Sequence, residues 1–278
     1  MDLTRQEQFL WGNLTWEELR DVAGQGRVVI LPIGAMEQHG RHLPLNTDNY
    51  IVSHLCYQVG RRIPDEVVIL PVIPFAFDAH HMHFPGTITI HWEHIINYVL
   101  DVLVSIAHHG FRRIVVVSGH GVNPPYLAVA GNELHYRTGA MCASLFWGTL
   151  IGDMGDLRES PTPGGMAHAC ELETSVVLYL DQARVRRERA EREMGFEQTP
   201  RIWMDIGIPA SGVHLGEIWW SGFSKTGVAG DATVATVEKG RLIFERAVEG
   251  FIKFVREFRA RQDIVPQDMH SGGARGNL

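Results

Sequence analysis

Short runs of β-branched and other apolar residues alternate along this chain with longer amphipathic stretches. The runs RVVILPI (27–33), VVILPVI (67–73) and RIVVVS (113–118) have the composition of buried strands. Segments 47–62 and 91–109, which lie between them, are typical of helices. Strands that alternate with helices form βα units, and these build a mostly parallel sheet covered by helices. The sequence therefore predicts the α/β class.

The second half of the chain continues this pattern, with a strand predicted over 141–147 and a helix over 169–180. Apolar residues spaced four, three, four and three apart predict a long last helix, and Asp231 is expected to cap its start. These apolar residues are Phe244, Val248, Phe251, Val255 and Phe258. No linker divides the chain, so we expect one domain over residues 1–261 and a polar tail over 262–278.

The composition excludes several classes of protein. Of the 278 residues, 45% are hydrophobic, which is too many for a disordered chain, and a net charge of −7 argues against a nucleic-acid binder. No run of about 18 apolar residues is present, so no helical membrane span is expected. The N-terminal segment lacks the pattern of a signal peptide, and three widely spaced cysteines match no disulfide framework. We therefore expect a cytoplasmic protein with neither a nucleic-acid nor a membrane partner.

Histidines and carboxylates gather at the ends of the predicted strands. The string GAMEQHGRHLPLNTD directly follows strand 27–33 and contains Glu37, His39 and Asp48. Carboxylate and imidazole together bind zinc, manganese or iron, whereas calcium prefers oxygen alone. Ligands bind beyond the carboxyl ends of parallel strands, so this string is a candidate metal site. The alternative is that Asp48 only favours the dipole at a helix start and that Glu37 is a surface residue.

Two further strings carry the same chemistry. SGHGVN follows strand 113–118 and contains His120, which either faces a cleft or caps the next helix. In AHACELETS, His168 stands three residues before Glu171, so the two would share a helix face, while Glu173 would project elsewhere. Carboxylates inside an apolar helix need partners, and a metal or an imidazole would supply them. The alternative is an exposed helix start whose acids favour the dipole.

The loop HHMHFPGT places three histidines in four residues. They are either metal ligands or, in the simpler interpretation that we favour, one or two of them line a substrate pocket and the others are solvated. Tryptophans lie more often in a core or an interface, and Trp147 is the one retained as a substrate contact. The candidate substrate-binding residues are His81, His83, Asn123 and Trp147.

Five strings occur in a fixed order over residues 31–240: LPIGAMEQHGRHLPLNTD, FPGTITI, VVVSGHGVN, AHACELETS and TGVAGDATVATVEKG. On these strings the chain resembles the creatininase (creatinine amidohydrolase) family. The resemblance implies a three-layer α/β/α sandwich with a mainly parallel sheet. It also implies two divalent metal ions per subunit (Zn, Mn or Fe), hydrolysis of an amide-like bond and a homo-oligomer, commonly a hexamer.

The resemblance assigns metal ligands by motif position. It implies that Glu37, Asp48 and His120 hold one metal, and that His39 and Asp48 hold the other, with Asp48 as the bridge. Val122 stands where creatinine-cleaving members carry a glutamate that binds the second metal, and valine cannot bind a metal. This difference argues against creatinine as the substrate. The loop GHGVN is closer to the GHGGN-like loops of other members.

The string AHACELETS supplies the remaining predicted roles. Glu171 is expected to replace the missing carboxylate and to bind the second metal. His168 and Glu173 match family positions near the reacting group. His168, oriented by Glu173, is expected to shuttle a proton to the leaving group.

The predicted function is metal-dependent hydrolysis, in which a water that bridges two divalent cations attacks a carbonyl carbon. The substrate is expected to be small, polar and cyclic: an amide or lactam, or a cyclic polyol ketone opened by C–C hydrolysis. The histidine-rich loop and the absence of aromatic residues in GGMAH favour a hydroxylated substrate slightly. The alternatives are a formamide deformylase of the pyrimidine or flavin-precursor type, a peptidase on a short peptide, and a non-catalytic maturation or binding protein. Part of segment 203–230, rich in Gly and Trp, is expected to contact a neighbouring subunit.

Overall fold

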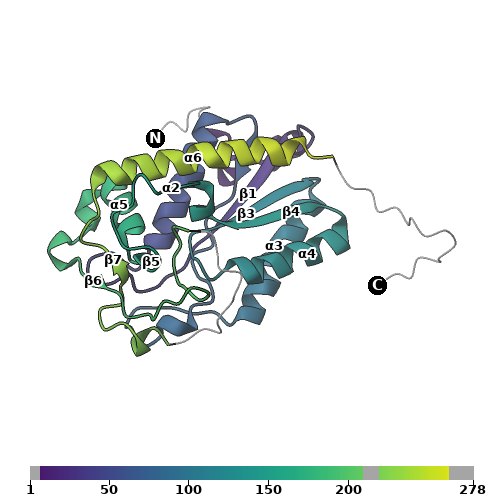
Figure 1. Ribbon diagram of the computed structural model, residues 1–278. Coiled ribbons are helices and arrows are strands. Elements are labelled where there is room, and N and C mark those ends of the chain that lie inside the picture. The colour runs from purple at the N-terminus through teal and green to yellow at the C-terminus, as the bar shows by residue number, and fades with distance from the viewer. Residues whose placement is uncertain (1–6, 209–218, 263–278) are drawn as a thin grey trace.

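A parallel sheet forms the centre of the molecule (Figure 1). The computed structural model describes residues 7–208 and 219–262. Within them the main sheet has the order β2-β1-β3-β4, and all neighbouring strands run parallel. These strands are β1 (Val28–Ile33), β2 (Val67–Ile69), β3 (Arg113–Ser118) and β4 (Met141–Phe146). The predicted α/β class is confirmed.

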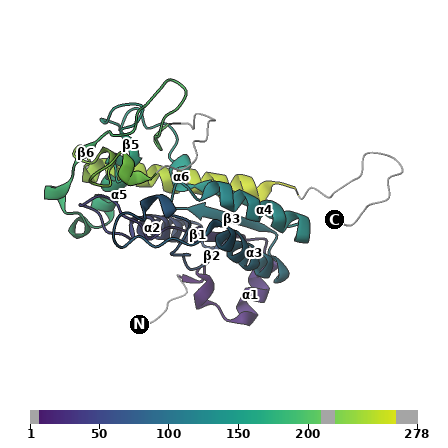
Figure 2. The ribbon, with the colours of Figure 1, turned by 90° about the horizontal axis from the view of Figure 1, so that it is seen from below.

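Helices cover both faces of this sheet, as Figure 2 shows from below. One face packs against α2 (Thr47–Arg62), α5 (Glu171–Leu180) and α6 (Val237–Ala260), and the other against α1 (Trp16–Ala23), α3 (Trp92–His108) and α4 (Pro124–Thr138). Along β1, Val28 and Ile30 join the first core, whereas Val29 and Leu31 join the second. Both faces of the strand are buried, which explains its continuous apolar run. The three-layer α/β/α sandwich is thereby confirmed.

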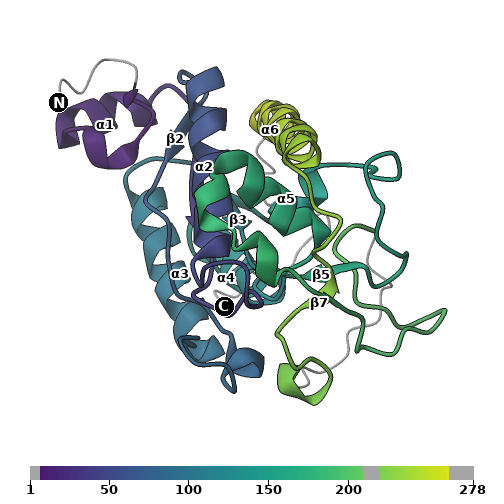
Figure 3. The same ribbon diagram turned by 90° about the vertical axis from the view of Figure 1, so that its left-hand side faces the viewer.

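A second, smaller sheet is antiparallel and has the order β5-β7-β6. Its strands are β5 (Met166–His168), β6 (Arg192–Glu193) and β7 (Ala229–Asp231). Figure 3 shows β5 and β7 side by side near α5. Within the described residues the short 3-10 helices are η2 (Trp11–Asn13), η3 (Ala79–His81), η4 (Trp147–Leu150), η5 (Gln182–Arg184), η6 (Arg187–Arg189) and η7 (Trp220–Gly222).

The helix predicted over 169–180 begins two residues later, at Glu171. Ala169 has a φ of +48°, which lies in the left-handed region and is incompatible with a right-handed helix. The chain therefore turns here between β5 and α5. His168 lies in the strand, so the argument that paired it with Glu171 on one helix face does not apply.

The start of the last helix also differs from the prediction. Asp231 ends β7, and its carboxylate accepts hydrogen bonds from the backbone and the hydroxyl of Thr233. Helix α6 begins after Thr236, whose hydroxyl accepts the backbone N–H of Lys239. Thr236 is therefore the N-cap, a position that threonine and aspartate both favour.

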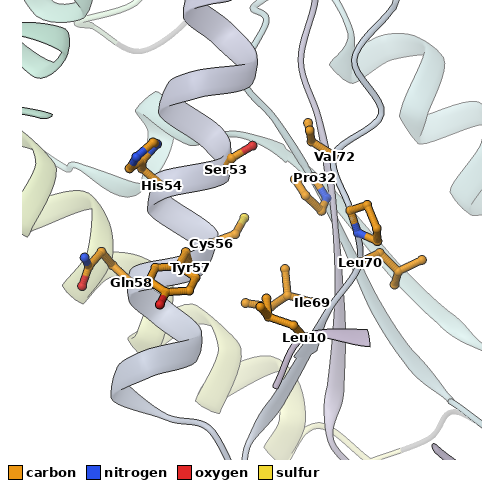
Figure 4. Close-up of a pocket in the computed structure, with 11 residues that line it drawn as sticks. Leu10, Pro32, Ser53, His54, Cys56, Tyr57, Gln58, Ile69, Leu70 and Val72 are labelled. Atoms are coloured by element: carbon orange, nitrogen blue, oxygen red, sulfur yellow. The ribbon is translucent and has the colours of Figure 1, made fainter. Parts of the chain in front are cut away.

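A pocket opens between α2 and the segment that follows β2 (Figure 4). It is lined by Leu10, Pro32, Ser53, His54, Cys56, Tyr57, Gln58, Ile69, Leu70, Pro71 and Val72. None of the candidate metal ligands lines it, so this pocket is separate from the candidate metal site.

Some predictions fall outside the described residues. The polar tail predicted over 262–278 lies there except for its first residue, and so does part of segment 203–230. Among the residues that are described, no helix is both long and apolar enough to span a membrane.

Candidate metal centre

The strand order of the main sheet reverses between β1 and β3, because β2 lies on one side of this pair and β4 on the other. In α/β sheets, ligands bind beyond the carboxyl ends of the strands at such a point. The loops after β1 and β3 carry Glu37 and His120, and the first turn of α2 carries Asp48. Gly119 permits their close approach, since a Cβ at this position would lie 2.5 Å from the backbone oxygen of Asp48.

Two carboxylates and two imidazoles form a buried cluster at this edge of the sheet. Nε2 of His39 lies 3.2 Å from Oδ1 of Asp48, and Nδ1 of His120 lies 3.3 Å from Oδ2 of the same carboxylate. Nδ1 of His120 is also 2.9 Å from Oε1 of Glu37. All four side chains are buried. Asp48 thus stands between two imidazoles, as a carboxylate that bridges two cations would.

Several buried polar atoms of this cluster lack a hydrogen-bond partner. Oε2 of Glu37, Nε2 of His39, Oδ2 of Asp48 and Nε2 of His120 are buried without a hydrogen-bond partner among the described residues. Buried polar atoms are nearly always paired, so four orphans in one cluster need a common explanation. A mixed carboxylate and imidazole set matches zinc, manganese or iron. The residues present therefore fit a divalent cation.

Backbone carbonyls orient two of the histidines. Nδ1 of His39 lies 3.3 Å from the backbone oxygen of Glu37, and Nε2 of His168 lies 2.7 Å from that of Gln38. Because a carbonyl only accepts, each of these ring nitrogens carries the proton. The opposite nitrogen of each ring is left with its lone pair free. This arrangement is the usual one for histidines that bind metals.

Gln38 fixes a third histidine in a different way. Its amide nitrogen donates to Nδ1 of His81 at 2.7 Å and to the Gly227 carbonyl at 3.0 Å, while its amide oxygen accepts from Gly40 N–H. Nδ1 of neutral His81 is thus an acceptor, and the ring proton sits on Nε2, 3.4 Å from Oε2 of Glu37. His81 thus faces Glu37 with an N–H, although the two do not form a hydrogen bond.

Glu173 joins the cluster from helix α5. Its Oε1 lies 3.8 Å from Nε2 of His39, and a ligand atom of His168 is close to both. The Glu173 carboxylate accepts from the backbone N–H of Cys170, and the His168 ring bonds to Gln38, so Glu173 does not orient His168 as predicted. Glu173 instead lies close to His39, which contacts Oδ1 of Asp48, whereas His120 contacts Oδ2.

Burial and neighbouring charges shift the pKa values of the carboxylates in the cluster. Burial, reinforced by the Asp48 carboxylate, raises the pKa of Glu37 well above its ordinary value. Burial also opposes ionisation of Asp48, but the adjacent His39 and His120 outweigh it and hold the pKa of Asp48 below its usual range. A dication would displace protons from such a cluster, so metal binding should release protons.

Glu171 lies away from the cluster, and the prediction that it binds the second metal is not supported. Its carboxylate accepts from the backbone N–H of Ser160 at 2.9 Å and of Glu159 at 3.1 Å. It also forms an ion pair of 2.6 Å with Lys239 of α6. With its oxygens committed to these donors, Glu171 ties α5 to α6 and to the loop before β5.

Replacement of Glu171 by glutamine should lower stability and leave metal content unchanged. We expect a loss of about 2 kcal/mol in the free energy of unfolding, because Lys239 would lose its buried charged partner and keep the exposed Glu159 carboxylate, 2.6 Å away. The Lys239 and backbone donors hold the pKa of Glu171 below its ordinary value against the effect of burial. The stabilisation is therefore complete above the unfolded-state pKa of about 4.3 and is lost as the pH falls through the folded-state value. Chemical denaturation of both proteins from pH 7 to pH 3 should show the difference shrinking. Loss of a cation from this variant would contradict the assignment.

The predicted substrate-binding residues separate in the structure. His81 is buried in the cluster, whereas His83 is exposed, stacks on Trp219 with ring centroids 4.1 Å apart and bonds to Ser221. Trp147 is fully buried in the core formed with α2, α5 and α6. Asn123 donates its amide to the Gly34 carbonyl and to Ser118. Only His81 is therefore close to the candidate ligands; Asn123 ties the two ligand-bearing loops together.

Sequence reasoning missed three side chains of this region: Gln38, Asp78 and Trp220. The ring of Trp220 lies 4.6 Å from that of His81 and 5.1 Å from that of His168, and its Nε1–H donates to the Gly227 carbonyl. Trp220, although distant from these histidines in the sequence, thus packs against their rings. Its only sequence signal was its place in a segment rich in Gly and Trp.

Comparison with known proteins identifies relatives that are all named as hydrolytic enzymes. The sequence model of the creatininase family, described as creatinine amidohydrolase, matches residues 12–255. The chain is 31% identical over 245 residues to the mycofactocin precursor peptide peptidase of Mycobacterium tuberculosis, covering 84% of this chain and 87% of the relative. It is 27% identical to the creatinine amidohydrolase of Pseudomonas putida, covering 88% and 95%. It is 26% identical to the 3-dehydro-scyllo-inosose hydrolase of Thermotoga maritima, covering 89% and 83%.

Solved structures share the fold over most of their length. A crystal structure of creatinine amidohydrolase matches with a TM-score of 0.79 at 24% identity, covering 91% of this chain and 99% of that chain. A mutant creatininase of the Zn-Zn type and a creatininase with Mn match with TM-scores of 0.77 and 0.75, each at 26% identity and with the same coverage. From the family match, the relatives and the buried cluster of ligands together, the chain belongs to the creatininase family of hydrolases.

Proposed function

We propose that this chain hydrolyses a small polar carbonyl compound with the help of two divalent cations, zinc, manganese or iron. Glu37, Asp48 and His120 would hold one cation, and His39, Asp48 and Glu173 would hold the other. The observation that carries the proposal is the position of Asp48, 3.2 Å from His39 and 3.3 Å from His120 at the reversal of the strand order. Glu173 takes the role that the sequence had assigned to Glu171.

Two cations, when bound, would lower the pKa of a shared water so that hydroxide is available near neutral pH. The chain's own residues then position the proton transfers. The bond from Nε2 of His168 to the Gln38 carbonyl leaves Nδ1 to accept a proton and pass it to the leaving group. Trp220, packed over His81 and His168, would exclude bulk water from that step.

The substrate that we propose first is an amide, cleaved at its C–N bond. Two of the relatives, the peptide peptidase and the creatinine amidohydrolase, have names that describe cleavage of such bonds. A cyclic polyol ketone is the second candidate. The observation in its favour is that one relative is named as an inosose hydrolase.

A panel assay tests this proposal. The full-length protein, freed of metal and reloaded with Mn²⁺ or Zn²⁺, would be incubated with lactams, formamides, short peptides and inosose-type ketones. We expect metal-dependent product formation from one class, with no turnover after chelation. A protein that binds no cation, or that binds two cations and turns over no carbonyl substrate, would favour the alternative of a non-catalytic binding protein.

A homo-oligomer, with a hexamer expected, also stays a proposal. Several large apolar side chains are exposed on the helices of one face: Trp92 and Tyr98 on α3, and Val129 and Tyr136 on α4. Light scattering at micromolar concentration should give a mass several times 31.2 kDa; a monomer would contradict this. The cytoplasmic location predicted from the sequence likewise stays a prediction.

A further inference from the structure

Asp78, in the loop that leads into η3, is a fully buried carboxylate with no assigned role. Its side chain is 0% exposed, and neither carboxylate oxygen has a hydrogen-bond partner among the described residues. Its backbone N–H donates to the Thr89 hydroxyl at 2.8 Å, which fixes the loop at this point. Buried polar atoms are nearly always paired, so these two oxygens call for a partner, which a cation would supply.

The neighbours of Asp78 are ligands of the proposed centre. Ligand atoms of Glu37, Asp78, His80 and His120 all lie within 4.8 Å of one another. Nδ1 of His80 is 3.7 Å from Oδ1 of Asp78, and the His80 ring stacks on that of His120 with centroids 5.8 Å apart. Asp78 therefore lies close to Glu37 and His120, two of the three residues that we assign to the first cation.

The charge balance of the cluster also supports a cation beside Asp78. Asp78 makes the fourth buried carboxylate of the centre, beside Glu37, Asp48 and Glu173. Four carboxylates balance the four positive charges of two dications.

We propose that Asp78 is a further metal ligand, which binds the cation held by Glu37 and His120. Asp78 and Glu173 belong to different groups of neighbouring ligand atoms, so they would serve different cations. In this chain the short loop before η3 thus supplies a carboxylate to the cation of Glu37 and His120, while Glu173 replaces the carboxylate that is missing at Val122. This inference rests on the proposed function, because it presumes the two-cation centre.

The test is metal binding by the full-length, metal-free protein. Calorimetric titration with Mn²⁺ should give two cations per wild-type chain. In Asp78→Asn, one binding step should weaken by roughly 10–100-fold or more, and the other should be unchanged. Titration with Co²⁺ should show an altered visible spectrum for that same step. The matched control is Asp231→Asn, the same change at a buried aspartate of β7 whose bonds are to Thr233; it should bind both cations as the wild type does.

The outcomes separate this inference from the proposed function. If the wild type binds no cation, the proposed function fails. If the wild type binds two cations and Asp78→Asn binds both with unchanged affinity, only the assignment of Asp78 is overturned. A third cation that Asp78→Asn alone removes would also overturn it, since Asp78 would then hold a separate ion.

A second variant and a stability measurement guard against misfolding. Asp78→Glu keeps a carboxylate and should bind the weakened cation more tightly than Asp78→Asn does. In chelator, Asp78→Asn should unfold at a temperature at least as high as the wild type, because a buried unpaired acid has been removed. With Mn²⁺ present, its gain in unfolding temperature should be smaller than that of the wild type. A variant that is less stable than the wild type to the same extent with and without metal would show a structural role and contradict the proposal.

Discussion

Replacement of Asp48 by asparagine should empty both cation positions at once. Asp48 lies within 3.3 Å of both His39 and His120, and an amide offers a neutral oxygen in place of two charged ones. Without the cations the site loses several kcal/mol of transition-state stabilisation, so kcat/KM should fall by about 10³-fold or more. Metal analysis after dialysis and steady-state kinetics with the substrate found in the panel would measure the two effects.

The control for this prediction is again Asp231→Asn, which should keep metal and activity. A drop in kcat/KM with full occupancy at both positions would contradict the bridging role of Asp48. Loss of only one cation would also contradict it, since Asp48 would then belong to a single position.

The second large effect concerns the division of labour between His168 and Glu173. His168→Ala should retain both cations but lose about 10²–10⁴-fold in kcat, the usual contribution of a general acid or base. Glu173→Gln should instead lose the cation that it shares with His39, because a ligand carboxylate is removed from a dicationic site. Excess Mn²⁺ or Zn²⁺ should restore part of the activity of Glu173→Gln and none of that of His168→Ala.

The opposite pattern would reverse the roles. If His168→Ala loses a cation and Glu173→Gln keeps both, then Nδ1 of His168 is the ligand and the proton passes through Glu173. Glu171→Gln is the matched control on the same helix, since it makes the same chemical change at a buried glutamate whose partners are Lys239 and backbone amides.

The framework of the fold could be predicted because its signals are local. The apolar runs 27–33 and 113–118 became the two central strands, and the segment 47–62 became α2 with the predicted bounds. Glu37 and His120 follow those strands directly, so the rule that ligands gather at the carboxyl ends of parallel strands was enough to bring them together.

The rest of the site depended on geometry that the sequence does not carry. The assignment of Glu171 rested on a helical spacing from His168, and the positive φ of Ala169 removed that spacing by separating strand from helix. Glu171 and Glu173 are two positions apart on α5, so their side chains point in different directions. The carboxylate that approaches His39 is that of Glu173. Asp78 and Trp220 gave no local signal, because their proximity to the cluster is set by loops from distant parts of the chain.

The way in which the centre is assembled has a consequence for folding. Its ligands come from the loops after β1 and β3, from the loop before η3 and from the first turns of α2 and α5, between Glu37 and Glu173. Parallel pairing such as that of β1 with β3 is non-local and forms late in folding. The nascent chain therefore offers no complete coordination sphere, and a cation cannot act as a nucleus for the fold. It can bind only after the sheet has formed, and once bound it slows unfolding. Metal supply should therefore govern how long a folded molecule survives rather than how fast it forms.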